Sequence, residues 1–510
     1  MSLTLLGIVV LAFCLRFAGA PHRLVQIVMV AGIFEAAAAA IIGSLGVQPG
    51  LVPGIMLVGL VAMQYAGGRR SVAEGQIFHI LSPLLLLLGY GAVTAIVLPD
   101  FFAGQIIVWP QKLDAMAPEP RPLAPGQGNI NQVLYLFANV CIAFAAALAM
   151  GRAVTPWRAL VRAYLLGGYI VVLLAFWQFA ARTVGVPFPD DILYSNPGWA
   201  IVEQNLGNLP RLQGPFPEPS ALAFYLSGVA LACTALCLHG HRVLRPDLLL
   251  VLCILVVFLS TSTTGAAALA IGLPLVLLGA AVRGQGRLGR VTRVLALPAG
   301  ALFVGALVLM VLRPEYMDVV ADVIAASLGK TETESFIERS DMNQAAWDAF
   351  LASGGIGIGW GSTRASSMVA GLLAGAGVVG VVAALWCALR LRRAMRAARA
   401  YPGHPAAVAL DAFYAAMAGQ LLAAVISAPM ITTPIFFAQL GVVVAATARV
   451  AVDARRQDAS EARPAGAVLR GSAADEFQRA TVQDSHSGRV GQRDEAVRDE
   501  LREVATDRFG

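Results

Sequence analysis

Long apolar segments, each about as long as a membrane-spanning helix, follow one another along most of this chain. A helix needs about 20 apolar residues to cross the hydrocarbon core of a bilayer. Of the 510 residues, 58% are hydrophobic and only 13% are charged. The sequence therefore predicts an all-α, polytopic helical bundle with about 12–13 transmembrane helices. The expected spans are residues 3–20, 24–45, 51–66, 76–98, 132–150, 163–181, 218–238, 247–262, 265–282, 294–312, 366–389, 406–429 and 431–448.

The two ends of the chain differ in composition. The first apolar segment resembles the core of a signal peptide, but it lacks preceding basic residues and Arg16 follows it instead. We therefore expect a first transmembrane helix with the N-terminus outside. Residues 451–510 are charged and poor in large apolar side chains, which favours a disordered or weakly helical cytoplasmic tail after a transmembrane domain of residues 1–450.

Arginine supplies nearly all of the positive charge, because Lys112 and Lys330 are the only lysines. The net charge of +6 does not indicate nucleic-acid binding, since the arginines cluster in short loops between apolar spans. Basic loops of membrane proteins lie on the cytoplasmic side. The long loops at 99–131, 182–217 and 313–365 are then extracytoplasmic, which argues against chemistry driven by ATP. The arginines assigned to the cytoplasmic side are Arg16, Arg23, Arg69, Arg70, Arg152, Arg158, Arg162, Arg242, Arg245, Arg283, Arg287, Arg290, Arg293, Arg390, Arg392, Arg393, Arg396 and Arg399.

A charged stretch, residues 331–367, lies in the third and largest of these extracytoplasmic loops. Thr331 and Glu334 have the spacing of a capping box, so we expect a helix to begin there. Its apolar stripe is predicted to lie on the membrane surface or on the bundle. Arg339 falls beside this stripe, and an arginine against an apolar face needs an anion. The stripe consists of Phe336, Ser340, Asn343, Trp347, Phe350 and Leu351.

Five glycines follow this helix, at positions 354, 355, 357, 359 and 361, too many for an ordinary helix end. Because glycine has no Cβ, such a backbone can approach a ligand closely. We expect Gly357 and Gly359 to contact substrate. The spacing does not fit a nucleotide-binding phosphate loop, and no cofactor is predicted.

A second candidate segment, residues 208–220, ends where an apolar span begins. Arg211 is expected to hold an anionic group, with Glu218 acting as a base. The alternative is a rigid proline turn in which Glu218 merely caps the helix and Pro219 lies in its first turn.

Arg211, Arg339 and Arg364 are outer-side arginines that the rule for basic loops does not explain. A guanidinium group makes two-point contacts with phosphate oxygens and keeps its charge, which suits holding a pyrophosphate. The alternative is salt bridges to neighbouring carboxylates. The candidate partners for such bridges are Glu218, Glu338 and Asp341.

Other polar residues give weaker signals. Glu35 falls inside the span 24–45, where it is either functional or paired with Arg16 or a polar neighbour on another helix. Asp190 and Asp191 lack a third ligand and are typical of a solvated turn, so no metal site is predicted. The six cysteines lie in apolar runs and are expected in the core. No histidine falls in the predicted outer loops, so no histidine base is expected.

These motifs together resemble a known family. R-x-x-G-x-F-x-E-P-S at 211–220 is followed by a Ser/Thr turn at 260–264, two predicted spans, Arg339, the glycine run and G-S-T-R-A-S-S at 361–367. Over residues 131–389 this order resembles the O-antigen ligase and polysaccharide polymerase superfamily, and G-S-T-R-A-S-S looks most like bacterial exopolysaccharide polymerases.

The resemblance implies a glycosyltransferase of the bacterial cytoplasmic membrane, with a GT-C-like helical fold and a large helical extracytoplasmic loop. Such an enzyme polymerises oligosaccharide repeats carried on undecaprenyl pyrophosphate at the outer face, without a metal or cofactor. The implied partners are the lipid-linked glycan, the lipid bilayer, a chain-length regulator and export machinery. Nucleic acid is not among them.

The resemblance also implies roles for individual residues. Arg211 and Arg339 would contact the pyrophosphate, Arg339 as a catalytic residue, with Arg364 a further candidate. Glu218 is the first candidate for the general base and Glu338 the second. Ligases of the family use a loop histidine, which is missing here, so a polymerase is favoured over a ligase. A flippase or exporter of the same glycans is the non-enzymatic alternative, for which two related halves and a cation-lined cavity would be expected.

Overall fold

The computed structural model describes residues 2–43, 45–111, 119–152, 154–197, 205–206, 209–282, 289, 296, 299–300, 334–427 and 433–461. The chain forms two compact units, Met1–Val452 and Asp453–Gly510, so the boundary lies close to the predicted one at residue 450. Residues 451–461 are helical, as the end of a helix that begins at Pro434. The rest of the predicted tail lies outside the described residues.

Eight helices among the described residues are long and apolar enough to cross a membrane. Three shorter apolar helices accompany them. These helices confirm the prediction of a mainly helical, multi-pass membrane protein. The long helices are α4 (Glu74–Phe101), α5 (Gln127–Met150), α6 (Trp157–Val184), α8 (Pro219–His239), α10 (Thr263–Val282), α14 (Met368–Ala398), α15 (Ala407–Ser427) and α16 (Pro434–Glu461), and the shorter ones are α1 (Leu5–Arg16), α3 (Leu51–Ala66) and α9 (Pro246–Leu259).

The predicted span 24–45 is wrong as a continuous helix. Helix α2 (Pro21–Ala31) stops early, and the following residues are not helical before strand β2 (Ala40–Ile42). The buried backbone there finds partners outside a helix: Thr4 N donates to Ala39 O at 3.1 Å, and Ala39 N donates to Val47 O at 2.7 Å. Buried N–H and C=O groups need such partners, and here neighbouring chain segments supply them.

The chain also contains short strands, so it is mainly helical but not all-α. Strand β2 pairs in antiparallel fashion with β1 (Ser2–Leu3) and β3 (Leu45–Val47). Two further hairpins consist of two-residue strands. The predicted span 294–312 lies almost entirely outside the described residues. The remaining elements are β4 (Ile107–Val108), β5 (Arg121–Pro122), α7 (Asp190–Leu193), β6 (Asn205–Leu206), β7 (Leu209–Pro210) and α13 (Glu334–Ala352).

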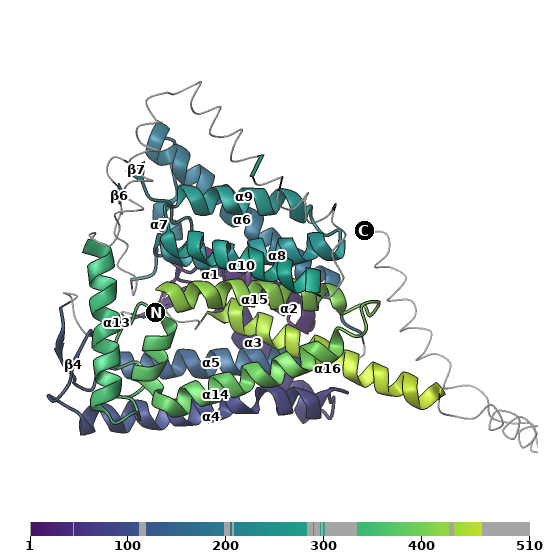
Figure 1. Ribbon diagram of the computed structural model, residues 1–510, viewed down its shortest axis with the longest axis horizontal. Coiled ribbons are helices and arrows are strands. Elements are labelled where there is room, and N and C mark those ends of the chain that lie inside the picture. The colour runs from purple at the N-terminus through teal and green to yellow at the C-terminus, as the bar shows by residue number, and fades with distance from the viewer. Residues whose placement is uncertain are drawn as a thin grey trace, which may run out of the picture. The chain divides into compact units, whose positions relative to one another are not determined.

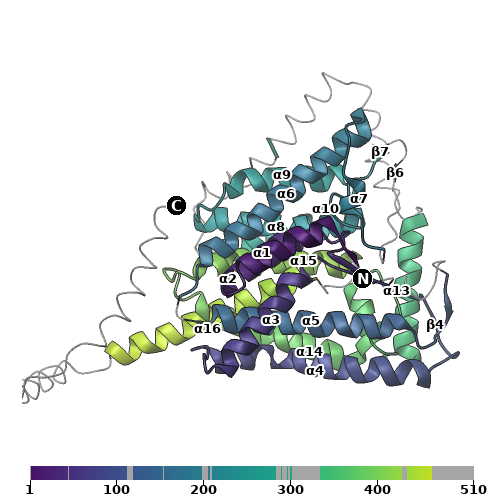
Figure 2. The ribbon, with the colours of Figure 1, turned by 180° about the vertical axis from the view of Figure 1, so that it is seen from behind.

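Helix α8 occupies the centre of the bundle. It packs against α6, α9, α10 and α15, and nearly all of its side chains are buried. Figures 1 and 2 show α8 and α15 running next to each other in the middle of the long helices. A helix held on all sides fixes the position of its first residues, and these belong to the predicted site.

The arginine-rich turns lie at one end of the long helices. Arg390, near the end of α14, donates to His79 O and to Ser82 Oγ (2.7 Å), near the start of α4. Tyr169 OH, in the first half of α6, donates to Arg245 O before α9. The glycine run, by contrast, lies beside Thr94 and Pro99, in the last part of α4. The predicted site therefore lies at the end opposite the basic turns.

Helix α13 runs across the ends of α4, α5 and α14 (Figure 1). Its predicted capping residue, Thr331, lies outside the described residues. The predicted stripe does not face the bundle, because Phe336, Trp347 and Leu351 are 44–58% exposed. The buried face is one step around the helix and consists of Met342, Ala346 and Ala349. Arg339 and Asn343 are partly buried beside it.

Candidate active site

Glu218 stands at the N-cap of α8, and Pro219 is the first helical residue, as the sequence predicts. Its side chain makes no capping hydrogen bond. The carboxylate instead accepts a hydrogen bond from Ser220 Oγ at 2.5 Å and lies 3.8 Å from Nη2 of Arg339. It is 30% exposed. The alternative in which the Glu218 side chain merely caps the helix is therefore wrong, and its carboxylate faces a cation from another helix.

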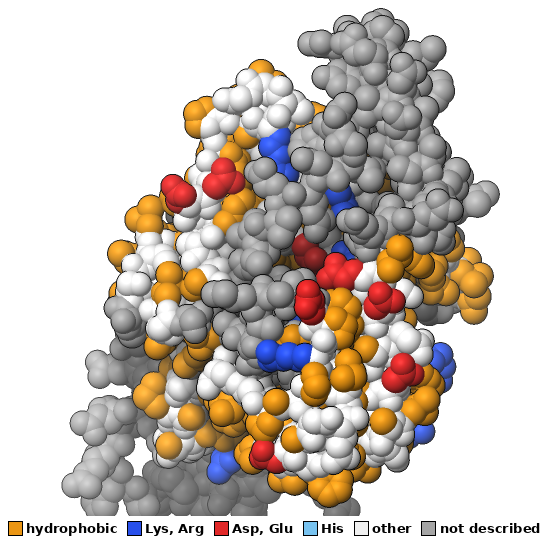
Figure 3. Space-filling model, turned by 90° about the vertical axis from the view of Figure 1, so that its left-hand side faces the viewer, with side chains coloured by type: hydrophobic (Ala, Val, Ile, Leu, Met, Phe, Trp, Pro, Cys, Tyr) orange, Lys and Arg blue, Asp and Glu red, His pale blue; other side chains and the backbone are white. Residues whose placement is uncertain are grey.

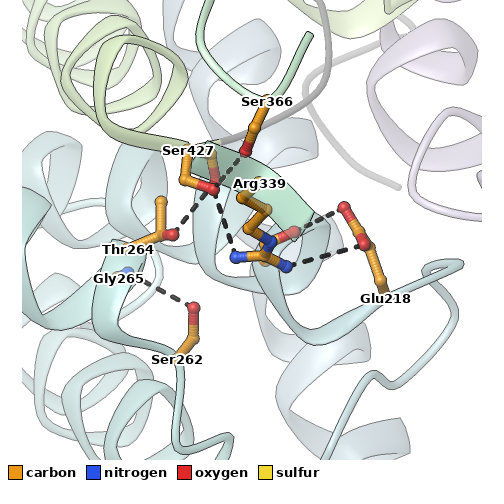
Figure 4. Close-up of polar contacts among 8 residues, drawn as sticks. Glu218, Ser262, Thr264, Gly265, Arg339, Ser366 and Ser427 are labelled. Carbon is orange, nitrogen blue, oxygen red and sulfur yellow. Dashed lines mark hydrogen bonds and ion pairs between the residues drawn. The ribbon is translucent and has the colours of Figure 1, made fainter. Parts of the chain in front are cut away.

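Arg339 extends from α13 between Glu218 and the end of α15 (Figure 4). Its Nη1 donates to Ser427 Oγ at 3.1 Å. Ser427 in turn shares a 2.7 Å hydrogen bond with Ser366 Oγ, and its carbonyl accepts from Thr264 Oγ1 at 3.0 Å. A guanidinium has five N–H groups, so one that contacts Glu218 and Ser427 among the described residues can also bind a ligand.

Arg211 lies in the loop before α8, and its Nε donates to Thr261 Oγ1 at 3.1 Å. Burial lowers the pKa of Arg211, the positive charge of Arg339 lowers it further, and Glu218 opposes both. Two guanidinium groups that repel each other in a partly buried site favour a bound anion between them. The backbone of this loop is held by Gln178 Oε1, which accepts from the amides of residues 213 and 214.

Arg364 reaches the same region from the loop before α14. Burial lowers its pKa, and the negative charges of Glu338 and Glu218 oppose that shift. Its backbone N–H donates to Trp109 O at 2.8 Å, which ties this loop to the β4 hairpin. The structure thus brings together the charged residues that the sequence singled out. They are Arg211, Glu218, Glu338, Arg339 and Arg364.

The salt-bridge alternative and the ligand hypothesis coexist in this geometry. The Arg339–Glu218 pair is observed, but at 3.8 Å between partly exposed groups it is a weak contact. Among the described residues, the three arginines lie near the carboxylates of Glu218 and Glu338. Figure 3 looks onto this end of the molecule and shows acidic and basic side chains gathered near the middle of the face.

Gly357 and Gly359 have a packing role that the sequence did not indicate. Both have positive φ, 85° and 101°. A Cβ on Gly357 would lie 2.8 Å from Gly377 N of α14, and one on Gly359 would lie 2.7 Å from Thr94 O of α4. Ile358 N donates to Ala374 O at 2.7 Å, so the run is bound to α14 by backbone hydrogen bonds. Contact of these glycines with substrate remains a prediction.

Several polar residues of the site are not predicted from the sequence. Ser427 lies inside a segment read as a membrane span, although the S-A-P that it begins marks the end of an apolar run. Thr261 belongs to the Ser/Thr turn that was noted, and it adopts a positive φ of 50°. For Asn343 the sequence predicts only a place in the stripe on α13.

Asn343 joins α13 to the start of α14. Its Oδ1 accepts hydrogen bonds from the backbone N–H groups of Ser366 (2.9 Å) and Ser367 (2.8 Å), and Ser367 is the N-cap of α14. We expect Asn343→Ala to destabilise the protein by about 2 kcal/mol, because it leaves partly buried donors without this acceptor. Thermal unfolding in detergent measures the loss. Asn343→Asp keeps an acceptor and should retain most of the stability; equal losses in both variants would contradict this role.

The remaining predicted residues lie elsewhere or form no site. Asp190 and Asp191 are exposed in the single turn of α7. Among the described residues no group of three His, Cys, Asp or Glu side chains is placed to hold a metal ion. His239 and His241 contact Asp411 at the far end of α8. Of the cysteines, Cys14, Cys233, Cys253 and Cys387 are buried.

No protein-family model matches this chain, and a search of curated proteins finds no match. The arginines of the site can hold a polyanionic group by charge and by two-point hydrogen bonds, and its carboxylates can accept a proton. That combination suits the departure of a phosphorylated leaving group.

Proposed function

We propose that this protein polymerises oligosaccharide repeat units carried on undecaprenyl pyrophosphate at the outer face of the cytoplasmic membrane. The observation that carries the proposal is the convergence of Arg211, Arg339 and Arg364 around Glu218, at the end of the bundle opposite the arginine-rich turns. The motif resemblance described above supplies the substrate class.

In the proposed reaction the pyrophosphate of a lipid-linked chain lies against these arginines. A hydroxyl of an incoming lipid-linked repeat attacks the anomeric carbon, and the bond to the pyrophosphate breaks. Negative charge then develops on the leaving pyrophosphate, where the guanidinium groups stabilise it. The activated bond supplies the driving force, so the protein has to position the reactants and stabilise charge.

The site geometry supports a reaction over transport. The arginines come from three separate segments and meet near carboxylates at one end of the helices. A flippase requires its binding site to be reached from both sides of the membrane, which favours cations along a central cavity.

The test is elongation by the purified protein in detergent, with undecaprenyl-pyrophosphate-linked repeats as the only glycan. A polymerase lengthens the glycan in steps of one repeat unit. Cells that lack the protein supply the second readout: single repeats should accumulate on the carrier at the outer face. Long lipid-linked polymer that never reaches its acceptor would indicate a ligase instead, and repeats retained on the cytoplasmic leaflet would indicate a flippase.

A further inference from the structure

The break after α2 brings another carboxyl group, Glu35, toward the candidate active site. Residues 32–39 are not helical, and they are bound to the loop in front of α8. Ala36 N donates to Pro215 O at 3.1 Å, and Asn196 N donates to Ala36 O at 3.2 Å. Pro215 lies only three positions before Glu218. The backbone next to Glu35 is therefore held against the loop that leads into Glu218, although the two segments are remote in sequence.

The surroundings of Glu35 allow it to hold a proton at neutral pH. Burial raises its pKa to about 7, and the negative charge of Glu218 contributes to the increase. Its side chain is partly buried. Among the described residues, the segments bound to the backbone of residues 36–39 contribute no charged side chain at their points of contact. Those contacts come from Thr4, Val47, Ser195, Asn196 and Pro215.

The other carboxylates of the site are engaged by cations. Glu218 accepts from Ser220 Oγ and lies beside Arg339, and the charge of Glu338 acts on Arg364. Both carboxylates are therefore already paired with arginines that are proposed to hold the pyrophosphate. A proton acceptor is still required, because the attacking hydroxyl must lose its proton as the glycosidic bond forms.

We propose that Glu35 is the general base of glycosyl transfer, an inference that rests on the proposed function. The acceptor oxygen bonds to the anomeric carbon while its proton passes to the Glu35 carboxylate. The bond from that carbon to the pyrophosphate oxygen breaks, and its electron pair leaves with the lipid pyrophosphate. Glu35 then returns the proton to water, which completes the cycle.

The test compares elongation of undecaprenyl-pyrophosphate-linked repeats by the wild-type protein and by Glu35→Gln, a substitution that keeps the shape but cannot take up the proton. We expect elongation to fall by about 100-fold or more, with binding of the lipid-linked repeat unchanged. In the wild type, elongation should rise as the pH increases through about 7, because the base must be ionised. Glu35→Gln should lack this rise.

The folded state of Glu35→Gln can be checked independently. Because the pKa of Glu35 in the folded protein is raised from its ordinary value of 4.5 to about 7, the protein loses stability as the pH rises across that interval, and the loss is complete above about pH 7. The neutral glutamine removes that penalty, so the variant should unfold at a temperature no lower than the wild type at pH 8. If elongation is lost while the unfolding temperature is preserved, the substitution has impaired the chemical step and not the folding of the protein.

Azide distinguishes loss of the general base from impaired departure of the leaving group. This anion attacks the anomeric carbon without losing a proton, so it needs no base. With Glu35→Ala, added azide should restore release of the lipid pyrophosphate and yield a glycosyl azide. The same azide should not rescue Arg339→Ala, in which departure of the leaving group is impaired. Failure of azide to rescue Glu35→Ala would overturn the assignment, as would normal elongation by Glu35→Gln, and both leave the proposed function intact. A wild-type protein that elongates nothing would overturn the proposed function and the assignment together.

Discussion

Replacing Arg339 by alanine is expected to abolish polymer formation while leaving the protein in the membrane. Arg339 is the group through which α13 contacts both Glu218 (3.8 Å) and Ser427 (3.1 Å). In the proposed reaction it stabilises the charge that develops on the pyrophosphate. Loss of one such donor slows catalysis by about 100- to 1,000-fold, so long polymer should disappear from cells that carry only this variant.

The contacts of Arg339 among the described residues link partly exposed groups, so its loss should cost little stability. Polymer length and the membrane level of the protein are measured together. Asp348→Ala is the matched control, because Asp348 is an exposed charged residue on the same helix, where it accepts a hydrogen bond from Gln344 Nε2 at 2.9 Å. It should behave as the wild type. An unchanged polymer yield from Arg339→Ala at a normal protein level would remove Arg339 from the mechanism.

Gly357→Ala is expected to disrupt the fold around the site. A Cβ at this position would lie 2.8 Å from Gly377 N and 2.9 Å from Ala374 O, both backbone atoms of α14. Neither can move without separating the glycine run from the helix. The backbone of α14 is itself not helical at Gly377 (φ 59°), where Val378 N donates to Gly355 O at 2.9 Å. The variant should therefore lose much of its folded yield, and activity with it.

Gly354→Ala is the control for backbone conformation alone. Gly354 also has a positive φ, 65°, but a Cβ there would meet nothing within 4 Å. Its cost should be limited to about 1–2 kcal/mol, the usual penalty for a side chain in the left-handed region. Comparing the melting temperatures of the two variants in detergent separates the clash from the conformational penalty. Equal stability of both would show that the close approach to α14 is not required.

Most of the helices follow from local sequence. The window at 51–66 coincides with α3, and those at 76–98 and 132–150 match α4 and α5 to within a few residues at each end. Apolar runs of this length satisfy their own backbone hydrogen bonds and expose only apolar side chains. Pro219 and Glu218 likewise mark the start of α8, because proline suits a first helical turn.

The prediction of a helix from an apolar run is wrong at residues 32–40. The alanines there are compatible with a helix, but their backbone groups pair with residues 4, 47, 196 and 215 instead. These partners are distant in sequence, so no local pattern could reveal them. The sequence also left open whether the stripe on α13 meets the membrane surface or the bundle, because an apolar pattern selects a face only when the surface that it meets is known.

The amino-acid sequence by itself determined that this chain forms a multi-pass helical protein, and it singled out the arginines and carboxylates that occur in polar loops, because charged groups are costly in an apolar environment. The tertiary structure decided which of them meet. Arg211, Arg339 and Arg364 come together around Glu218 because α8, α13 and α14 place their ends at the same side of the bundle. It also added Ser427, Asn343 and Glu35, whose surroundings depend on contacts between segments far apart in the chain.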